Sequence, residues 1–366
     1  MQTLTLVDGI FFGLWYDVKA KHRQTYMGKT RSAPTLNDVA KAAGVSTATV
    51  SRCLNSPERV IEKTRERVMH AVESLGYTPN FAARVMAAKR SFTIGAIIPT
   101  MDNAIFARGL QEFQDQLRES GYTLLVSSSA YDPKVEHEQI RTLVARGADG
   151  LLLIGHARDA EVYAYLEKHQ IPSLVAWSYD PHMHPPSVGF GNAAAMDELA
   201  QSVISVGHRR IAMISGITQG NDRAQARVEG VRKAMADNGL DANALTLIET
   251  SYEIDKGAEA FGQLMALSPR PTVVMCGNDV LAVGALRQAE KLGIQIPEQV
   301  SVTGFDDIEL AEIVTPALTT VHVPHREMGR KAARELIAMV EGKSEGRSLC
   351  IDTRLVNRGS LAKPPC

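Results

Sequence analysis

A short run near the front of the chain combines hydroxyl side chains with one arginine. Ser46, Thr49 and Ser51 carry hydroxyl groups, and Arg52 carries a planar guanidinium. Hydroxyl groups can donate to phosphate oxygens, which positions a protein on a duplex without reading its sequence. A guanidinium can donate two hydrogen bonds to the O6 and N7 atoms of a guanine, the commonest base-specific contact. The run therefore has the chemistry of a nucleic-acid contact.

The charge of the chain supports an anionic partner for this region. Residues 27–90 contain eleven Lys and Arg against five Asp and Glu, whereas residues 91–366 contain 26 against 34. A small basic module joined to a larger acidic body is typical of a protein whose front end meets a polyanion. Charge alone leaves a second interpretation open, a basic face that is merely solvated.

Three short helices are predicted to hold the run in place. The first begins at Thr35 with a capping-box pattern and ends at Gly44, and the second begins at the N-cap Ser46. The third covers about 62–75. Two helices joined by a tight glycine turn form a helix-turn-helix, whose second helix lies in the major groove of DNA. The side chains predicted to face the core of this module are Val50, Leu54, Val68, Ala71, Val72 and Leu75.

From residue 92 onward, apolar runs alternate with amphipathic helices. The runs predicted as strands are 94–98, 124–127, 150–154, 173–176, 211–214, 272–276 and 300–304. Apolar strands separated by helices indicate parallel sheets covered on both faces. A weak repeat relates 93–121 to 210–239, which predicts two similar subdomains with a cleft between them. Ligands of such sheets bind beyond the carboxyl ends of the strands.

Other classes of protein fit the sequence poorly. The four cysteines form no C-x-x-C pair, which argues against a disulfide framework or a zinc site and suits a reducing cytoplasm. The early apolar run 10–16 is too short to span a bilayer and is a poor signal peptide. Residues 189–194 match a dinucleotide fingerprint, but no acidic residue follows about twenty positions later. No nucleophile–base pair is recognisable, so neither catalysis nor a cofactor or metal is expected.

Together these motifs resemble the lactose-repressor (LacI/GalR) family of transcription factors, over about residues 33–360. The matching segments are 35–40, 43–46, 49–52, 76–80, 207–211, 278–284, 304–307 and 316–321. The resemblance implies an N-terminal all-α helix-turn-helix domain and an α/β main body of two Rossmann-like subdomains, similar to type I periplasmic binding proteins. It also implies at least a homodimer on double-stranded DNA with a near-palindromic operator. Because no apolar heptad run is visible at the C-terminus, a dimer is expected rather than a tetramer.

The resemblance also divides the chain. Residues 27–78 are assigned to the helix-turn-helix domain, 79–91 to a hinge helix and linker, and 92–366 to the effector-binding and dimerisation core. Residues 1–26 precede the match. Met27 begins a short basic arm like those that start such proteins. We therefore expect 1–26 to be either a poorly ordered extension or the result of a translation start assigned too far upstream.

The match to the family motif places Thr47, Ala48 and Arg52 against base edges, where Ala48 offers only a methyl group. The hinge run resembles a helix that wedges an apolar lever into the minor groove, and Met86 stands where the family usually has leucine. An ordinary linker is the alternative. Ile61 replaces the family's small polar cap, so the third helix should start less well capped, at a shifted position. The residues expected to contact DNA are Thr35, Ser46, Thr47, Ala48, Thr49, Ser51, Arg52, Asn55, Thr64, Asn80, Ala83, Met86 and Ala87.

The same match places Arg227, Asn278 and Asp306 in the cleft. Asn and Asp side chains can hold vicinal hydroxyls, and Arg can bind hydroxyls or a carboxylate. Aromatic walls and one rim are expected from four further residues, for two of which, Phe106 and Phe190, core packing is the alternative. These four residues are Asn103, Phe106, Trp177 and Phe190.

The implied effector is a sugar or sugar derivative. Residues 175–178 and 323–329 resemble the gluconate-type branch of the family, so a sugar acid is the first expectation. The sequence thus predicts a cytoplasmic regulator, most often a repressor, whose operator affinity changes when an effector shifts the two subdomains. The alternative is a solute-binding protein of sugar uptake. That alternative explains the cleft, but it requires export and leaves the basic module unexplained.

Overall fold

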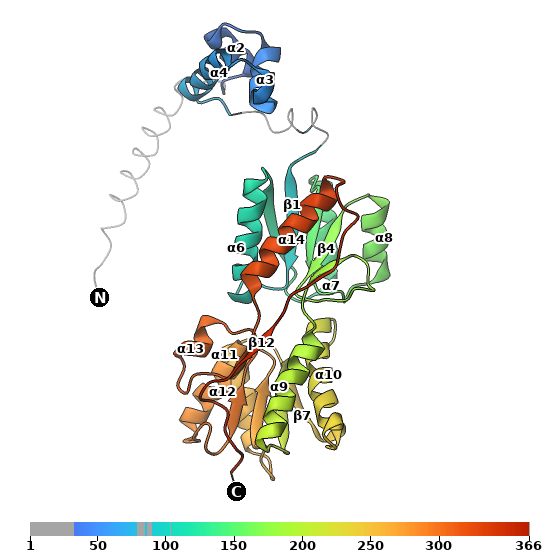
Figure 1. Ribbon diagram of the computed structural model, residues 1–366, viewed down its shortest axis with the longest axis vertical. Helices are drawn as coiled ribbons and strands as arrows, with labels where there is room; N and C mark the ends of the chain where they lie inside the picture. Colours follow the sequence, from blue (N-terminus) through green and yellow to red (C-terminus); the bar gives the residue numbers. More distant parts are fainter. Residues whose placement is uncertain (1–32, 79–84, 86–89, 103, 366) are drawn as a thin grey trace, which may run out of the picture. The chain divides into compact units, whose positions relative to one another are not determined.

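The computed structural model describes residues 33–78, 85, 90–102 and 104–365. Contacts separate the chain into two units, 1–87 and 88–366, and each is described by itself. Figure 1 follows the chain from the small helical unit into the α/β unit. The predictions for residues 1–26 lie outside the described residues, as do nearly all of those for 79–91.

The first unit is helical, as its caps predict. Its elements are α2 (Leu36–Ala43), α3 (Thr47–Asn55), the short 3-10 helix η1 (Pro57–Arg59) and α4 (Glu62–Leu75). The Thr35 side chain accepts from the Asp38 N–H, and the Asp38 carboxylate accepts from the Thr35 N–H, which is a complete capping box. Gly44 ends α2 with φ 63°, a left-handed conformation that glycine adopts without strain.

One hydrophobic core joins the helices of the first unit. Val39, Val50 and Val68 are fully buried, and Cys53 lies beside them. The prediction that Leu75 faces the core is wrong, because its side chain is 37% exposed in the last turn of α4. Ile61 precedes α4 without a side-chain cap, as expected, yet the helix begins at Glu62 with no shift. An ion pair between Glu62 and Arg65 spans that first turn.

The second unit contains two parallel sheets in two subdomains. The first sheet has the order β11-β5-β4-β3-β1-β2, and the second has the order β7-β6-β8-β9. The strands of the first sheet are β1 (Thr93–Ile98), β2 (Thr123–Ser128), β3 (Gly150–Ile154), β4 (Ser173–Ala176), β5 (Ser187–Gly189) and β11 (Leu349–Cys350). Those of the second are β6 (Ile211–Gly216), β7 (Thr246–Thr250), β8 (Val273–Cys276) and β9 (Ser301–Thr303).

Helices cover both faces of each sheet. In the first subdomain, α6 (Ala104–Glu119) packs with α14 (His325–Val340), while α7 (Pro133–Ala145) and α8 (Ala160–Lys168) bury Ile140 and Leu166 against the opposite face. In the second, α9 (Asn192–Val206) packs with α10 (Asp222–Asp237), and α11 (Ile254–Met265) packs with α12 (Asp279–Lys291) (Figure 1). The short helices η2 (Ala242–Ala244) and α13 (Glu309–Ile313) lie in connections.

The chain crosses between the subdomains more than once. It passes into the second subdomain before α9, returns to the first with α14 and β11, and ends in the second with β12 (Arg354–Val356). There β12 pairs antiparallel with β10 (Thr320–His322). The predicted repeat is confirmed, since β1-α6-β2 and β6-α10-β7 have the same topology. The carboxyl ends of the two sheets thus border one cleft.

Candidate functional site

The second helix of the first unit has two distinct faces. Its N-cap Ser46 accepts from the Thr49 N–H at 3.1 Å, and the two hydroxyl oxygens lie 2.9 Å apart. Val50 and Cys53 are buried against the core, as predicted. Ala48 and Arg52 are exposed, so the face that carries the arginine is turned outward.

The other residues predicted to contact DNA fall into three groups. Thr35 and Thr47 are exposed, although the Thr35 hydroxyl already serves the capping box. Thr49, Ser51 and Thr64 are half-buried. Asn55 is the last residue of α3, and its side chain lies outside the described part of the structure. The positions wholly outside the described residues are Asn80, Ala83, Met86 and Ala87.

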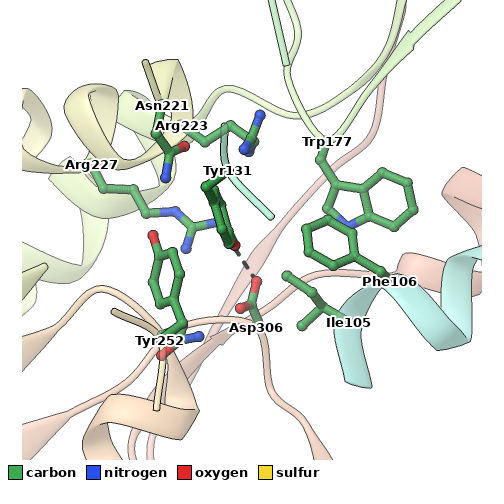
Figure 2. A pocket seen from close by; sticks show the side chains of 10 residues that line it. Ile105, Phe106, Tyr131, Trp177, Asn221, Arg223, Arg227, Tyr252 and Asp306 are labelled. Atoms are coloured by element: carbon green, nitrogen blue, oxygen red, sulfur yellow. Dashed lines mark ion pairs between the residues drawn. The ribbon is translucent and has the colours of Figure 1, made fainter. Parts of the chain in front are cut away.

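A small cavity lies where the carboxyl ends of the two sheets meet. Five of the seven residues predicted for the effector line it, namely Phe106, Trp177, Arg227, Asn278 and Asp306. Five further residues that no motif marked also line it, namely Ile105, Tyr131, Asn221, Arg223 and Tyr252. Figure 2 shows these side chains converging from both subdomains. The free space between them is about 20 Å³, which is room for one water molecule.

Two predicted effector residues do not appear in this lining. Phe190 is buried and its ring stacks on Phe305, with the centroids 6.0 Å apart. It therefore packs in the core in this structure, which was the alternative left open for it. The match to the family motif suggested the wall, but the Phe190 ring packs on Phe305, whose ring also contacts the guanidinium of Arg227. Asn103 lies outside the described residues.

Arg227 is held on several sides. Its Nε–H donates to Asn192 Oδ1 at 2.9 Å, and an Nη1–H donates to the carbonyl oxygen of Gly277 at 2.6 Å. Its guanidinium carbon lies 3.9 Å from the centroid of the Phe305 ring, a cation–π distance. The remaining Nη2 is 3.7 Å from Asp306 Oδ1. The arginine is thus pre-positioned with one edge toward the carboxylate.

Asp306 presents an unsatisfied carboxylate to the cavity. The residue is 1% exposed, and neither carboxylate oxygen has a hydrogen-bond donor among the described residues. Burial raises the pKa of Asp306 to about 6, although Arg227 opposes the rise. Buried polar atoms without partners are rare in proteins. Two acceptor oxygens in this position fit a ligand that supplies hydroxyl or amide donors.

His325 places a second nitrogen near the same oxygen of the carboxylate. Its Nδ1 accepts from the indole N–H of Trp177 at 3.2 Å, so the proton of the neutral ring is on Nε2. That Nε2 lies 3.7 Å from Asp306 Oδ1 and has no hydrogen-bond partner in the described part of the chain. Burial, with Arg227 adding to it, lowers the pKa of His325 to about 3. The ring is therefore neutral at physiological pH.

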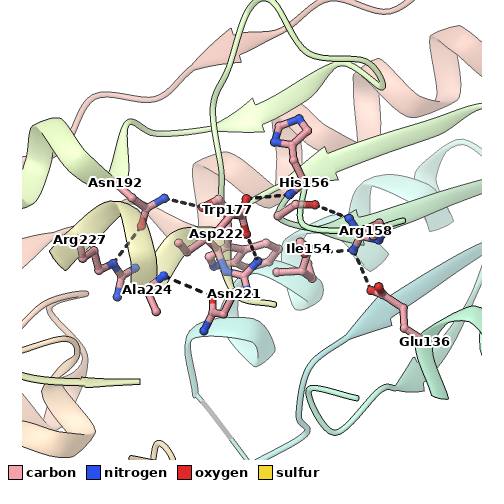
Figure 3. A network of polar contacts seen from close by, with 12 residues as sticks. Glu136, Ile154, His156, Arg158, Trp177, Asn192, Asn221, Asp222, Ala224 and Arg227 are labelled. Atoms are coloured by element: carbon pink, nitrogen blue, oxygen red, sulfur yellow. Dashed lines mark hydrogen bonds and ion pairs between the residues drawn. The ribbon is translucent and has the colours of Figure 1, made fainter. Parts of the chain in front are cut away.

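Asparagine side chains join the walls to the framework. Asn278 and Asn221 accept from the N–H groups of Leu281 and Ala224, so they cap α12 and α10. Asn192 donates to the carbonyl oxygen of Trp177 at 3.0 Å and accepts from Arg227 (Figure 3). One amide thus links a wall in the first subdomain to a wall in the second.

Comparisons with known proteins agree with this geometry. Residues 35–80 match the lacI family of bacterial regulatory proteins, and residues 200–361 match the periplasmic binding protein-like domain. The repressor PurR of Vibrio cholerae is 33% identical over 86% of this chain and 94% of its own length. The chain belongs to the LacI family. The repressor CytR of Escherichia coli is 31% identical over 92% of this chain and 99% of its own length.

Solved structures of LacI-family members have the same fold. The lac repressor dimer bound to operator and an anti-inducer superposes with a TM-score of 0.81, at 25% identity, over 90% of this chain and 100% of its own. The CelR–cellobiose complex superposes with a TM-score of 0.66, at 29% identity, over 89% and 99%. The predicted fold class and family are confirmed. The chain is a DNA-binding transcriptional regulator with an allosteric ligand and not an enzyme, and the solute-binding alternative is not favoured.

Proposed function

We propose that this regulator is a homodimeric repressor whose operator affinity is set by a sugar-type effector in the cavity. The observation that carries the proposal is the buried carboxylate of Asp306, whose two oxygens have no donor among the described residues. Vicinal hydroxyls of a sugar supply two donors to one carboxylate. The neutral His325 and the edge of Arg227 stand ready to donate to the same ligand.

The charges of the cavity bear on the choice between a sugar and a sugar acid. Arg227 faces Asp306, and Arg223 is paired with Asp222 at 3.1 Å. A ligand carboxylate beside Asp306 would place two negative charges together, so the hydroxyl end belongs there. Arg223 lines the cavity as well, and it is the residue that would receive the carboxylate of a sugar acid. The gluconate-type expectation stays a prediction.

The DNA contact is proposed for the outward face of α3. Thr47, Ala48 and Arg52 are exposed on this helix, and its dipole directs its N-terminus toward phosphate. The proposed division of the chain remains 27–78 for DNA binding, 79–91 for the hinge and 92–366 for effector binding and dimerisation. None of the described helices has the length and apolar character that a bilayer crossing requires. We place the action of the regulator in the cytoplasm, because bacterial operators lie there.

A two-fold dimer is proposed because a near-palindromic operator needs two recognition helices. Leu125 and Val126 on the edge strand β2 are 36% and 38% exposed. An uncovered apolar edge strand favours pairing with another surface. Light scattering should give twice the chain mass, and Leu125→Lys should shift the mass toward that of a monomer. A wild-type protein that stays monomeric at micromolar concentration would contradict the dimer.

The effector proposal is tested by a thermal-shift screen of the full chain. The ligands are D-glucose, D-galactose, D-ribose, cellobiose and D-gluconate. A ligand that binds only the folded chain stabilises it, and the melting temperature rises as the ligand concentration exceeds the dissociation constant. Selection from random duplexes supplies the operator, whose affinity is then measured with and without the ligand that binds. Arg227→Ala and Asp306→Ala should abolish the shift and leave binding to random DNA unchanged. If both variants bind the ligand as well as wild type, the effector site is elsewhere.

A further inference from the structure

The effector cavity is nearly filled by the protein itself. Its free space of about 20 Å³ is far below the roughly 300 Å³ or more of typical small-molecule sites. A sugar therefore requires that the cavity widen, by separation of the two subdomains, by withdrawal of a lining side chain, or by both. The question is which of the ten lining residues can move.

Most of the walls are anchored. Trp177 is 2% exposed, and its indole N–H is bonded to His325. The ring of Tyr252 lies directly on Gly216, where an added Cβ would collide with it, and its hydroxyl is hydrogen-bonded to Asn221. Arg227 is held by two hydrogen bonds and by ring stacking. None of these side chains can withdraw without loss of buried contacts.

Tyr131 is different. It follows the edge strand β2 and is 41% exposed, whereas the other lining side chains are buried or half-buried. Its ring nevertheless lines the cavity and contacts the Tyr252 ring, and burial raises the pKa of its hydroxyl. Figure 2 shows the ring between Arg227 and Phe106, with Asp306 beneath it. The phenol thus lies in the same cavity as the unsatisfied carboxylate, without a hydrogen bond to it.

The backbone that carries Tyr131 is in an unfavourable conformation. Ala130 has φ 52° and Tyr131 has φ 60°. Two consecutive residues with side chains are thus left-handed, a region that costs energy for L-amino acids. The inserted position is maintained by the ring's contacts, including the tilted contact with Tyr252 at a centroid distance of 6.0 Å. If the loop withdraws, these ring contacts are lost and the strain of the left-handed backbone at 130–131 is released.

We propose that Tyr131 is a gate that occupies the effector's space and swings outward when the ligand binds. Its ring competes with the ligand for the position in front of Asp306, so the closed gate lowers the apparent affinity. The proposal rests on the proposed function, because the ligand that displaces the ring is the effector. A gate differs from a fixed wall of the binding site. A wall contacts the bound ligand and raises its affinity, whereas the closed gate lowers it.

The first test needs no ligand. All variants carry Trp15→Phe, so that Trp177 is the sole tryptophan, and the probe is quenching of its fluorescence by acrylamide. Tyr131→Ala should raise the quenching constant by about twofold or more, because local openings govern access to buried groups. Tyr131→Phe keeps the ring and should behave like the parent. Tyr165→Ala is the matched control, since that ring contacts His169 on another part of the first subdomain. Equal quenching in Tyr131→Ala and the parent overturns the gate.

The second test separates a gate from a wall. Calorimetry measures the dissociation constants of D-ribose, D-glucose and D-gluconate with the parent and Tyr131→Ala. If the open form is about a tenth of the population, removal of the gate lowers the dissociation constant about tenfold. A higher constant in Tyr131→Ala would assign the ring to a wall and overturn the gate. Absence of binding to both proteins would count against the proposed effector class, while the quenching result still decides the gate.

Discussion

The carboxylate of Asp222 accepts a hydrogen bond from the backbone N–H of His156 at 2.7 Å and so joins the two subdomains beside the cavity (Figure 3). Asp222 is the first residue of α10, and His156 follows β3 after Gly155, whose φ is 70°. A Cβ on Gly155 would collide with Asp222 and Arg223. The close approach of the subdomains at this point therefore depends on a glycine.

Removal of this link should loosen the cleft. Asp222→Ala leaves the His156 N–H without its acceptor, at a cost of about 1–3 kcal/mol in the free energy of unfolding. Asp222→Asn keeps an acceptor oxygen and should lose less. Asp237→Ala is the control, because Asp237 is an exposed partner of Lys233 on the same helix. Urea unfolding checks the prediction, and equal losses for Asp222→Ala and Asp237→Ala would contradict it.

The ionised carboxylate of Asp306 should lower the free energy of unfolding at neutral pH. Its raised pKa of about 6 means that the folded chain binds the proton more tightly than the unfolded chain. The stability gained from protonation is full below pH about 4 and is lost as pH rises through about 6. Asp306→Asn should therefore stabilise the fold above pH 7 by up to about 3 kcal/mol, with little gain at pH 4, while effector binding is lost.

The neighbouring carboxylate provides a control of opposite sign. Hydrogen bonds from Arg358 and His322 outweigh burial and hold the pKa of Asp307 below its usual value. Asp307→Asn should consequently lower stability at pH 7, with the difference shrinking as the pH falls. Urea unfolding of both variants between pH 4 and pH 8 checks the pair. If the two variants change the free energy of unfolding in the same way across this pH range, the two carboxylates do not have pKa shifts of opposite sign.

Arg52 should carry sequence preference. Arg52→Ala should weaken binding to the selected operator by about 1–3 kcal/mol and relax the preference at one guanine. Binding to random duplexes should fall much less. Arg59→Ala is matched in charge, and Arg59 is exposed beside Glu58 in η1. If Arg52→Ala binds the operator as the wild type does, α3 does not read bases through this side chain.

The start of α4 leaves room for stabilisation. Ile61 is 79% exposed and provides no side-chain cap. Ile61→Ser should stabilise the first unit by about 1 kcal/mol, seen as slower hydrogen exchange of the amides in 62–75. Thr35→Ala removes the capping box of α2 and should have the opposite effect of similar size. Unchanged exchange in Ile61→Ser would mean that the Glu62–Arg65 pair already satisfies this helix start.

Much of the fold followed from local patterns. The capping motif at Thr35, the glycine at 44 and the serine at 46 mark the ends of α2 and α3, because caps act within one helical turn. The strongly apolar strands were equally visible. Four strands of only two or three residues and the polar strand β7 were missed, since too few apolar residues mark them. These are β5, β7, β10, β11 and β12.

The residues of the cavity also divide into those that a sequence motif marks and those that no motif marks. Arg227, Asn278 and Asp306 stand in recognisable motifs, and the structure brings all three to the cavity. Tyr131 and Tyr252 stand in no motif, but both follow edge strands at similar positions in the repeat. The rule that ligands bind at the carboxyl ends of strands could have pointed to Tyr131 after the predicted strand 124–127, and to Tyr252 had β7 been recognised.

By itself, the sequence determined the family, the helix-turn-helix and the three polar residues of the cleft, because caps, periodicity and motifs are local in the chain. Only the tertiary structure decided that Phe190 packs on Phe305, that His325 is neutral beside Asp306 and that Tyr131 lines the cavity. These facts depend on contacts between segments far apart in sequence. Burial, pKa and free volume arise only when such segments meet, so no local pattern contains them.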